Sequence, residues 1–230
     1  MPATGKRIPP AEVPAAKARL GETAYERILE MLFARQIPAG AFVSQSQLAA
    51  LVDIPIAPLR DALKVLEVEG IVTIHPGSGI EFVKPGFELT RATYQYRGIL
   101  ERAAIAIYVE TVDDSELAEL ERRHLAVIAK IESHGLDDQA HAQIEGLDKA
   151  LHSGIIGSLD NPLIETSFKR IHNYLRLIRL ERRISPAMAL KSLREHMQII
   201  SACKARDAEA AAAALRRHFD AALQRILKLY

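Results

Sequence analysis

One aspartate and three histidines fall on the apolar faces of predicted helices, in positions that suit metal binding. Asp148 and His152 are one turn apart, so both side chains point to the same side as the apolar stripe of their helix. His196 and His218 each fall on the apolar stripe of a later helix. A carboxylate placed inward must find a partner, because an isolated buried charge is very costly. One carboxylate and three imidazoles predict a site for a divalent transition metal of the Zn, Ni, Mn or Fe type.

Spacing alone leaves a second interpretation of these residues open. An inward histidine is commonly a hydrogen-bonded core residue, since buried polar groups are normally satisfied. Asp148 and His152 would then form only a buried salt bridge. His172 fits either the core or a pocket. The other histidines of this region are interpreted as surface residues: His124, His134 and His141.

Arg97 and Glu101 form a second polar pair, one turn apart in an earlier helical segment. Arg97 could hold an effector carboxylate through two parallel hydrogen bonds. Alternatively, the two residues pair with each other on a partly buried face, because an inward arginine usually has a partner. Asn173 and Arg176 are further candidates for lining an effector pocket.

These side chains must be positioned by the region from residue 87 to 230, where every periodic segment predicts a helix. The expected helices span residues 89–110, 115–133, 137–157, 162–183, 186–206 and 207–229. Six helices joined by short loops predict an all-helical antiparallel bundle, which would hold the candidate metal ligands in one domain.

The first third of the chain predicts three helices and a β-hairpin. The helices are expected from Thr23 to about Pro38, from Gln45 to Val52, and from about Pro58 to Gly70. Two β-prone segments, 71–74 and 80–83, flank a sequence with turn chemistry. Residues 21–84 therefore predict a winged helix-turn-helix, the layout of a DNA-binding domain. The fold class expected for the chain is mostly α, with this domain followed by the bundle.

The sequence also predicts an N-terminal arm and the buried faces of the second and third helices. Residues 1–20 are rich in Pro and Ala and are expected to form a flexible arm. The buried face of the second helix is expected to contain Leu48, Ala49 and Leu51. The buried face of the third is expected to contain Leu59, Ala62, Leu63, Leu66 and Val68.

The start of the third helix is the predicted base-reading element, because a helix enters the major groove with its N-terminal turns. Arg60 lies on the exposed face of its first turn and could reach a phosphate or a guanine edge. The other interpretation is a solvated surface arginine, which is common. The further candidates for DNA contact are Arg35, Ser44, Gln45, Ser46, Gln47, Ala57, His75 and Ser78.

The bulk composition limits the function classes. Lys and Arg number 30 and Asp and Glu 29, so any DNA binding must come from a local patch. One cysteine excludes an intramolecular disulfide and fits a reducing cytosol. The N-terminus lacks the apolar region of a secretory signal, and no run approaches a membrane span. We therefore expect a cytoplasmic protein.

The first third resembles the winged helix-turn-helix of the GntR family of regulators, most specifically in Pro58-Leu-Arg-Asp-Ala-Leu63 and Glu69-Gly-Ile-Val72. The resemblance implies a homodimer that binds a double-stranded DNA operator. The segment Asp148-Lys-Ala-Leu-His152, with Glu195-His196 and the run from Asp207 to His218, resembles the ligand-binding (FCD) domain of the FadR branch, in its shorter VanR-like version with six helices. That resemblance implies a metal held by Asp148, His152, His196 and His218, with open positions for water or an effector carboxylate.

One segment departs from the family pattern. The family places Ser-Arg-Thr just before the proline of the third helix, and this chain has Pro55-Ile56-Ala57. A base-reading cation is lost, together with a hydroxyl able to cap the helix. Basic and acidic residues also roughly balance up to Lys84, whereas a DNA-binding module is usually distinctly basic.

Three functions follow from these observations, in order of preference. The first is a transcriptional regulator, which we expect to be a repressor. A small organic acid would relieve the repression. The second is a metal- or metabolite-binding module whose DNA binding has weakened. The third is a metal-dependent hydrolase, since an open Asp/His site can activate water. Against an enzyme, His-Glu-x-x-His, Gly-x-Ser-x-Gly and nucleotide-binding loops are all missing from the sequence.

Overall fold

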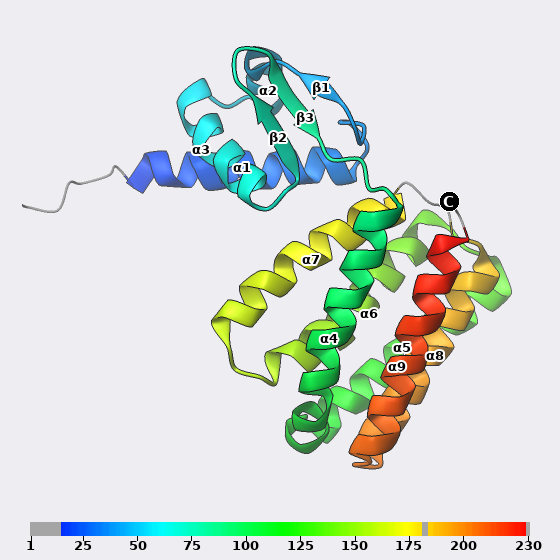
Figure 1. Cartoon of the computed structure of the whole chain (residues 1–230). Helices are drawn as coiled ribbons and strands as arrows, with labels where there is room; N and C mark the ends of the chain where they lie inside the picture. The colour runs from blue at the N-terminus through cyan, green and yellow to red at the C-terminus, as the bar shows by residue number, and fades with distance from the viewer. Residues whose placement is uncertain (1–14, 181–183, 229–230) are drawn as a thin grey trace, which may run out of the picture. The chain divides into compact units, whose positions relative to one another are not determined.

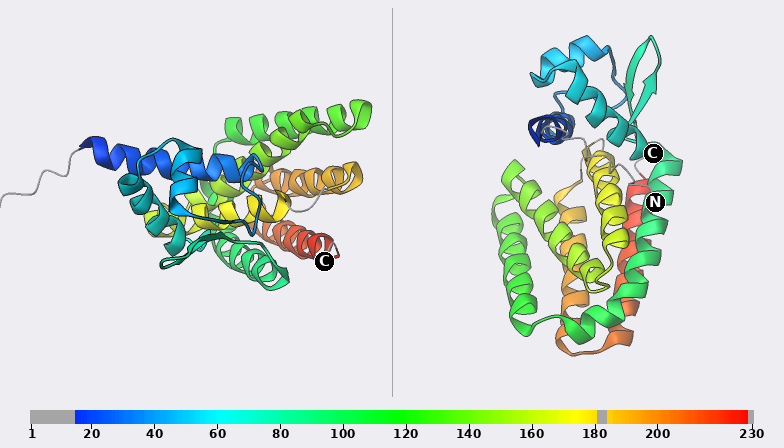
Figure 2. Two further views of the ribbon diagram at one scale, coloured as in Figure 1. Left: turned by 90° about the horizontal axis from the view of Figure 1, so that it is seen from above. Right: turned by 90° about the vertical axis from the view of Figure 1, so that its left-hand side faces the viewer.

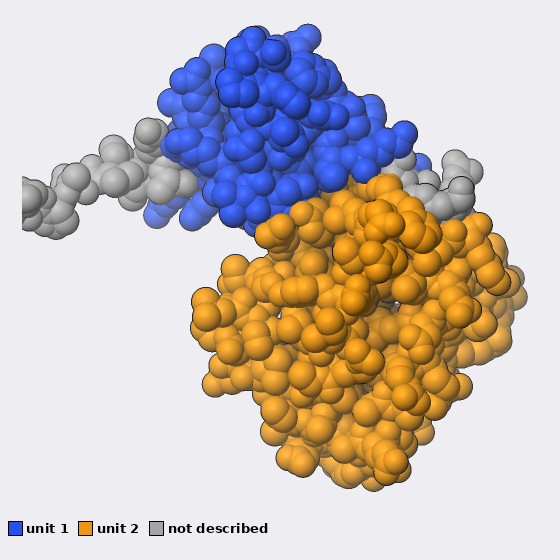
Figure 3. Space-filling view, viewed as in Figure 1, with its two compact units in different colours: residues 1–84 blue, residues 85–230 orange. Residues whose placement is uncertain are grey.

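The computed structural model describes residues 15–180 and 184–228. The chain divides into two compact units, residues 1–84 and residues 85–230, coloured separately in Figure 3. Each unit has its own buried core and is described by itself. No helix in the described ranges is long and apolar enough to cross a membrane.

The described part of the first unit, from residue 15 on, contains three helices and a small antiparallel sheet (Figure 1). In chain order the elements are α1 (Ala15–Phe33), β1 (Phe42–Val43), α2 (Gln45–Val52), α3 (Ile56–Val68), β2 (Val72–His75) and β3 (Gly79–Phe82). The sheet order is β1-β3-β2, and Ile74 lies opposite Ile80 in the hairpin. This arrangement confirms the predicted winged helix-turn-helix.

Some local predictions for this unit were wrong. Helix α1 begins at Ala15, so residues 15–20 are helical and not a flexible arm; residues 1–14 lie outside the described residues. Leu51 is 48% exposed and Val68 is 77% exposed, because α2 turns Val52 inward instead and α3 ends its buried stripe at Leu66. Strand β1 was not predicted, since two residues are too short to show a period.

Gly79 allows β1 and β3 to approach each other closely. A Cβ at this position would lie 2.7 Å from a ring carbon of Phe42 and 2.8 Å from the carbonyl oxygen of Val43. Any other residue would therefore push the wing apart at the point where the turn enters β3.

The second unit is a bundle of helices, which confirms the fold class predicted from the sequence. Its elements are α4 (Phe87–Thr111), α5 (Asp114–His134), α6 (Asp138–Gly157), α7 (Pro162–Leu180), α8 (Pro186–Lys204) and α9 (Ala208–Leu227). Helices α4 and α9 lie side by side in Figure 1 and in the right-hand view of Figure 2. The predicted extensions to residues 183 and 229 fall outside the described residues.

Unusually for a helical core, the centre of this bundle is polar. Apolar side chains such as Leu147, Leu151 and Leu193 pack around it. The buried polar residues of the bundle are Thr90, Thr93, Arg97, Glu101, His124, Asp148, His152, His196 and His218. Because unpaired buried polar groups are costly, these side chains need hydrogen-bonding or charged partners within the bundle.

Candidate metal centre and DNA-binding surface

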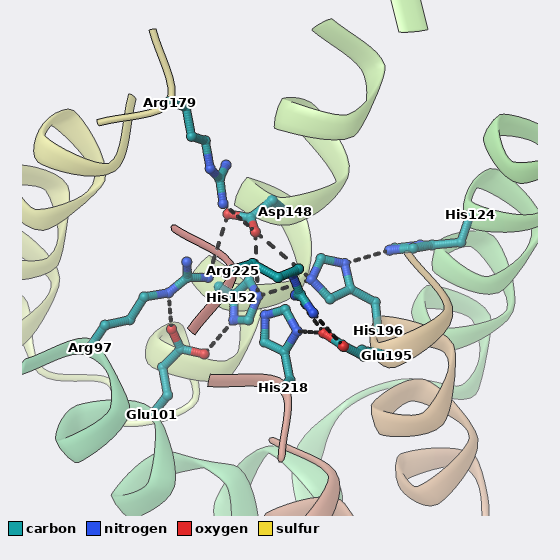
Figure 4. Close-up of polar contacts among 10 residues, drawn as sticks. All are labelled: Arg97, Glu101, His124, Asp148, His152, Arg179, Glu195, His196, His218 and Arg225. Carbon is teal, nitrogen blue, oxygen red and sulfur yellow. Dashed lines mark hydrogen bonds and ion pairs between the residues drawn. The ribbon is translucent and has the colours of Figure 1, made fainter. Parts of the chain in front are cut away.

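Four side chains from three helices converge at the centre of the bundle (Figure 4). Helix α6 supplies Asp148 and His152, α8 supplies His196 and α9 supplies His218. One ligand atom from each lies within 4.8 Å of all the others, and all four residues are buried. The structure thus brings together the four residues that the sequence analysis singled out.

Carboxylates fix the orientation of two of these imidazoles. His152 Nδ1 lies 2.5 Å from Glu101 Oε2, and His218 Nδ1 lies 3.0 Å from Glu195 Oε2. A carboxylate accepts hydrogen bonds, so each Nδ1 carries the proton. The lone pair of each ring therefore sits on Nε2. A buried carboxylate behind a histidine is the arrangement that commonly orients a metal-binding imidazole.

His124 fixes the third imidazole. Its Nδ1 lies 2.7 Å from the carbonyl oxygen of Leu120, which can only accept, so His124 Nδ1 carries the proton. Burial lowers the pKa of His124, so its Nε2 is an unprotonated acceptor. That Nε2 lies 3.2 Å from His196 Nδ1, which must then be the donor. The lone pair of His196 is accordingly also on Nε2.

The lone pairs of His152 and His196 lie close to a carboxylate oxygen of Asp148, and His218 offers a ligand atom within 4.8 Å of the other three. His152 Nε2 and His196 Nε2 lie 3.4 Å apart, and Asp148 Oδ1 lies 3.7 Å from the first and 3.8 Å from the second. When both rings are neutral and protonated on Nδ1, the 3.4 Å contact joins two acceptors. Two nitrogen ligands at ~2.1 Å from a tetrahedral ion are separated by ~3.4 Å. The donor set therefore fits a divalent cation.

Burial and neighbouring charges favour the metal-binding protonation states of His196, His218 and Asp148. Burial lowers the pKa of His218 to about 4, and burial followed by the neighbouring histidines lowers that of His196 well below its ordinary value. Burial alone would raise the pKa of Asp148, but Arg179 and Arg97 outweigh it and hold that pKa well below the usual range.

The charges around the centre balance before any metal is added. Asp148 accepts hydrogen bonds from Arg179 at 2.8 Å and from Arg97 at 3.5 Å. Arg97 also donates to Glu101 at 2.6 Å. Arg225 donates two hydrogen bonds to Glu195, at 2.6 and 2.7 Å. Three guanidinium groups thus offset three carboxylates, so a divalent ion would leave the centre with excess positive charge.

The sequence analysis missed several residues of this network. His124 was interpreted as a surface residue, and this was wrong, because its side chain is fully buried. It follows Leu117 and Leu120 on the inward stripe of α5, a signal that the sequence contained. Arg179 and the pair of Glu195 and Arg225 were also missed as centre residues. Their contacts join different helices, which spacing within one helix cannot reveal.

The predicted effector-binding residues have partners within the protein. Arg97 is 1% exposed and pairs with Glu101. Of the two interpretations offered for this arginine, the structure therefore shows the ion pair with Glu101. Arg176 forms an ion pair with Glu145, and Asn173 is half-buried on the same helix, α7. Of the two guanidiniums beside Asp148, that of Arg179 is the one near solvent, with 27% of its side chain exposed.

We expect His124 to control metal affinity through His196. In His124→Leu the acceptor for His196 Nδ1 is lost, so the ring no longer holds one tautomer and metal affinity should fall about 10- to 100-fold. His124→Gln retains an acceptor oxygen and should recover part of the loss. A competitive titration of zinc against a chelator measures both, with the exposed His134→Leu as control. Unchanged zinc affinity in His124→Leu would refute the role of this hydrogen bond.

In the first unit, the predicted phosphate-contacting residues at the start of α2 bond to one another. Ser44 is the N-cap, its Oγ accepts from the Gln47 amide at 3.2 Å, and Gln47 Oε1 accepts from the Ser44 amide at 2.9 Å. This reciprocal capping box fixes the helix start. Ser46 Oγ lies 3.1 Å from Ser44 Oγ.

Arg60 and Gln45 connect α3 to α2. Arg60 is exposed, and its Nε donates to Gln45 Oε1 at 3.0 Å, so it is not simply a solvated arginine. Ala57 is exposed in the first turn of α3. The remaining candidates for DNA contact lie at loop and wing positions. Arg35 follows α1 with a φ of 59°, His75 Nε2 lies 2.9 Å from Glu81 Oε2 in the hairpin, and Ser78 is exposed in its turn.

A winged helix-turn-helix followed by an all-helical domain is an architecture typical of DNA-binding regulators. Residues 20–82 match the model of the family described as "Bacterial regulatory proteins, gntR family", and residues 92–221 match that of the FCD domain. The chain belongs to the GntR family of bacterial regulatory proteins and carries an FCD domain. It is a DNA-binding transcriptional regulator and not an enzyme.

Individual relatives agree with this assignment. The chain is 23% identical to the HTH-type transcriptional regulator YdhC of Bacillus subtilis, over 85% of this chain and 86% of that one. It shares its fold with E. coli McbR/YncC, with a TM-score of 0.74, 20% identity and coverage of 92% and 98% of the two chains. It also resembles the metal-free FCD domain of TM0439, with a TM-score of 0.52, 21% identity and coverage of 63% and 95%.

Proposed function

We propose that the chain is a repressor that binds operator DNA as a homodimer in the cytoplasm, and that a small carboxylate metabolite bound at a metal centre relieves the repression. Within the family, we assign it to the FadR branch in its VanR-like version, because the described part of the bundle contains the six helices α4–α9. The observation that carries the proposal is the buried cluster of Asp148, His152, His196 and His218, whose ligand atoms lie within 4.8 Å of one another.

Asp148, His152, His196 and His218 would hold the metal. These ligands suit a divalent ion of the Zn, Ni, Mn or Fe type, which supplies positive charge and open coordination positions when bound. Glu101, His124 and Glu195 keep the three imidazoles in the tautomer that presents Nε2. The protein's own contribution is thus a preorganised set of buried ligands.

Charge favours an anionic effector. Because three guanidiniums already offset three carboxylates, the ion would leave the centre positive, and a carboxylate would restore balance. Among the residues bonded to the four ligands, Arg179 has the most exposed side chain at 27%, against 14% for Glu195 and Arg225. We therefore expect the effector to enter past Arg179 and to meet the guanidiniums of Arg179 and Arg97 beside Asp148. Asn173 and Arg176, on α7 with Arg179, would line the entry.

A homodimer fits both the DNA-binding class and the surface of the bundle. Two-fold protein symmetry matches two operator half-sites. Helices α4 and α7 carry large apolar side chains exposed on the isolated chain, among them Ile99 at 54% and Leu163 at 81%. Effector binding that differs between two arrangements of the dimer would change the spacing of the DNA-binding units.

The proposal is tested by DNA affinity with and without effector. Metal-loaded protein is bound to a duplex selected from sheared genomic DNA, and a panel of small carboxylates is added. We expect one carboxylate to weaken DNA binding about 5- to 150-fold, the usual range of allosteric coupling. His196→Ala should bind the same duplex without responding. A carboxylate that binds the protein and leaves DNA affinity unchanged would contradict the coupled mechanism.

A second candidate function is a sensor with weakened DNA binding that acts through a protein partner. The start of α3 favours it, since Pro55-Ile56-Ala57 contains neither a basic residue nor a side-chain cap. The same genomic DNA experiment separates the two. A specific duplex that stays bound at raised salt supports the repressor, whereas purely non-specific binding that disappears with salt supports the sensor.

A further inference from the structure

The first turn of α3 presents an apolar side chain to solvent. Ile56 is the first residue of the helix and is 43% exposed, and Ala57 beside it is exposed too. The stripe that anchors α3 in the core consists of Pro58, Leu59, Ala62, Leu63 and Leu66. Ile56 is thus left out of the core even though a large apolar side chain gains free energy by burial. Its side chain is therefore available for contact with a partner outside the unit.

The neighbours of Ile56 place it in the DNA-contacting region. Arg60 follows one turn later, so the two side chains lie on the same side of the helix. Arg60 is exposed and hydrogen-bonded to Gln45, the first residue of α2. In a winged helix-turn-helix the N-terminal residues of the second helix of the motif meet the base edges in the major groove. Ile56 is therefore continuous with the surface through which this class of protein binds DNA.

The other exposed apolar side chains of α3 differ from Ile56 in position. Val65 is 49% exposed and Val68 is 77% exposed, but both belong to the last turn of the helix. A recognition helix reads bases with its first turns, so these valines do not share the role of Ile56. Val68 is instead a matched control on the same helix.

We propose that Ile56, assisted by Ala57, reads thymine methyl groups in the major groove, beside a base contacted by Arg60. The C5 methyl of thymine is the apolar group that the major groove displays, and apolar side chains recognise it by contact. A polar or charged base edge would leave Ile56 without a matching partner and would lose its own hydration. Each half-site should therefore contain a T·A pair next to the base pair that Arg60 contacts.

Removing the methyl group tests this inference directly. The full-length protein first selects preferred duplexes from a randomised library, and each thymine of the preferred duplex is then replaced by uracil. Burial of one methyl group predicts about a fourfold loss of affinity at one position in each half-site. Ile56→Ala should bind the thymine and uracil duplexes equally well. Val68→Ala should keep the fourfold difference, and melting curves check that both variants fold.

Four results would overturn the proposed contact between Ile56 and a thymine methyl group. Equal affinity of the wild type for all uracil duplexes, or a thymine preference that persists in Ile56→Ala, would overturn the inference. Selection of no preferred sequence would also overturn it, and failure to bind any duplex would overturn DNA binding as well. In Ile56→Arg we expect the preferred base at that position to change from thymine to guanine, because a guanidinium pairs with guanine O6 and N7.

Discussion

Arg97→Leu is expected to lower the free energy of unfolding by about 3–5 kcal/mol, the cost of removing one partner from a buried ion pair. Arg97 is 1% exposed and donates to Glu101 at 2.6 Å and to Asp148 at 3.5 Å. Leucine would leave two buried carboxylates with fewer donors in a medium that stabilises charge poorly. Urea unfolding at pH 7, with a chelator present so that bound metal does not contribute, measures the change.

Arg91→Leu is the matched control for this prediction. Arg91 lies on the same helix and pairs with Glu88, but half of its side chain is exposed. Its loss should change the free energy of unfolding by no more than about 1 kcal/mol, because exposed ion pairs contribute little. Similar effects of the two substitutions would show that the Arg97 network does not stabilise the bundle.

Metal loading is expected to raise the melting temperature by roughly 5–15 °C. A ligand at 100 to 1,000 times its dissociation constant stabilises the folded state by about 2.7–4.1 kcal/mol, and each kcal/mol shifts the melting of a domain of 150–250 residues by about 2–4 °C. The measurement is a thermal melt of chelator-stripped protein before and after addition of zinc. In His196→Ala one of the four ligands is missing, so the rise should be lost or strongly reduced.

His134→Ala serves as the control for non-specific binding. His134 is exposed at the end of α5 and belongs to no cluster of ligand atoms among the described residues. This variant should respond to zinc like the wild type. If His196→Ala responded equally, the stabilising ion would be bound elsewhere on the chain.

The architecture and the four proposed ligands could be predicted from the sequence, because they depend on the spacing of apolar and polar residues within single helices and strands. The spacing of Asp148 and His152 on the apolar stripe of α6 specifies their common direction, whatever packs against them. The β-prone segments 71–74 and 80–83, with turn chemistry between them, likewise specify a hairpin. Helix ends were less accurate, as the start of α1 at Ala15 shows, since no strong capping residue marks it.

The remainder of the site depends on contacts between helices. Arg179 reaches Asp148 from another helix, and Arg225 reaches Glu195 from a residue 30 positions away. No pattern within one helix specifies such pairs. His124 is the exception, because its position on the inward stripe of α5 already indicates a buried histidine, which here contacts His196.

Metal content is the most direct test of the central claim, that Asp148, His152, His196 and His218 form a metal centre. Wild type and His196→Ala are purified without chelators and examined by elemental analysis. We expect close to one divalent transition-metal ion per chain in the wild type and almost none in His196→Ala. No metal in either protein after reloading, or equal metal in both, would contradict it and reduce the three histidines to core residues.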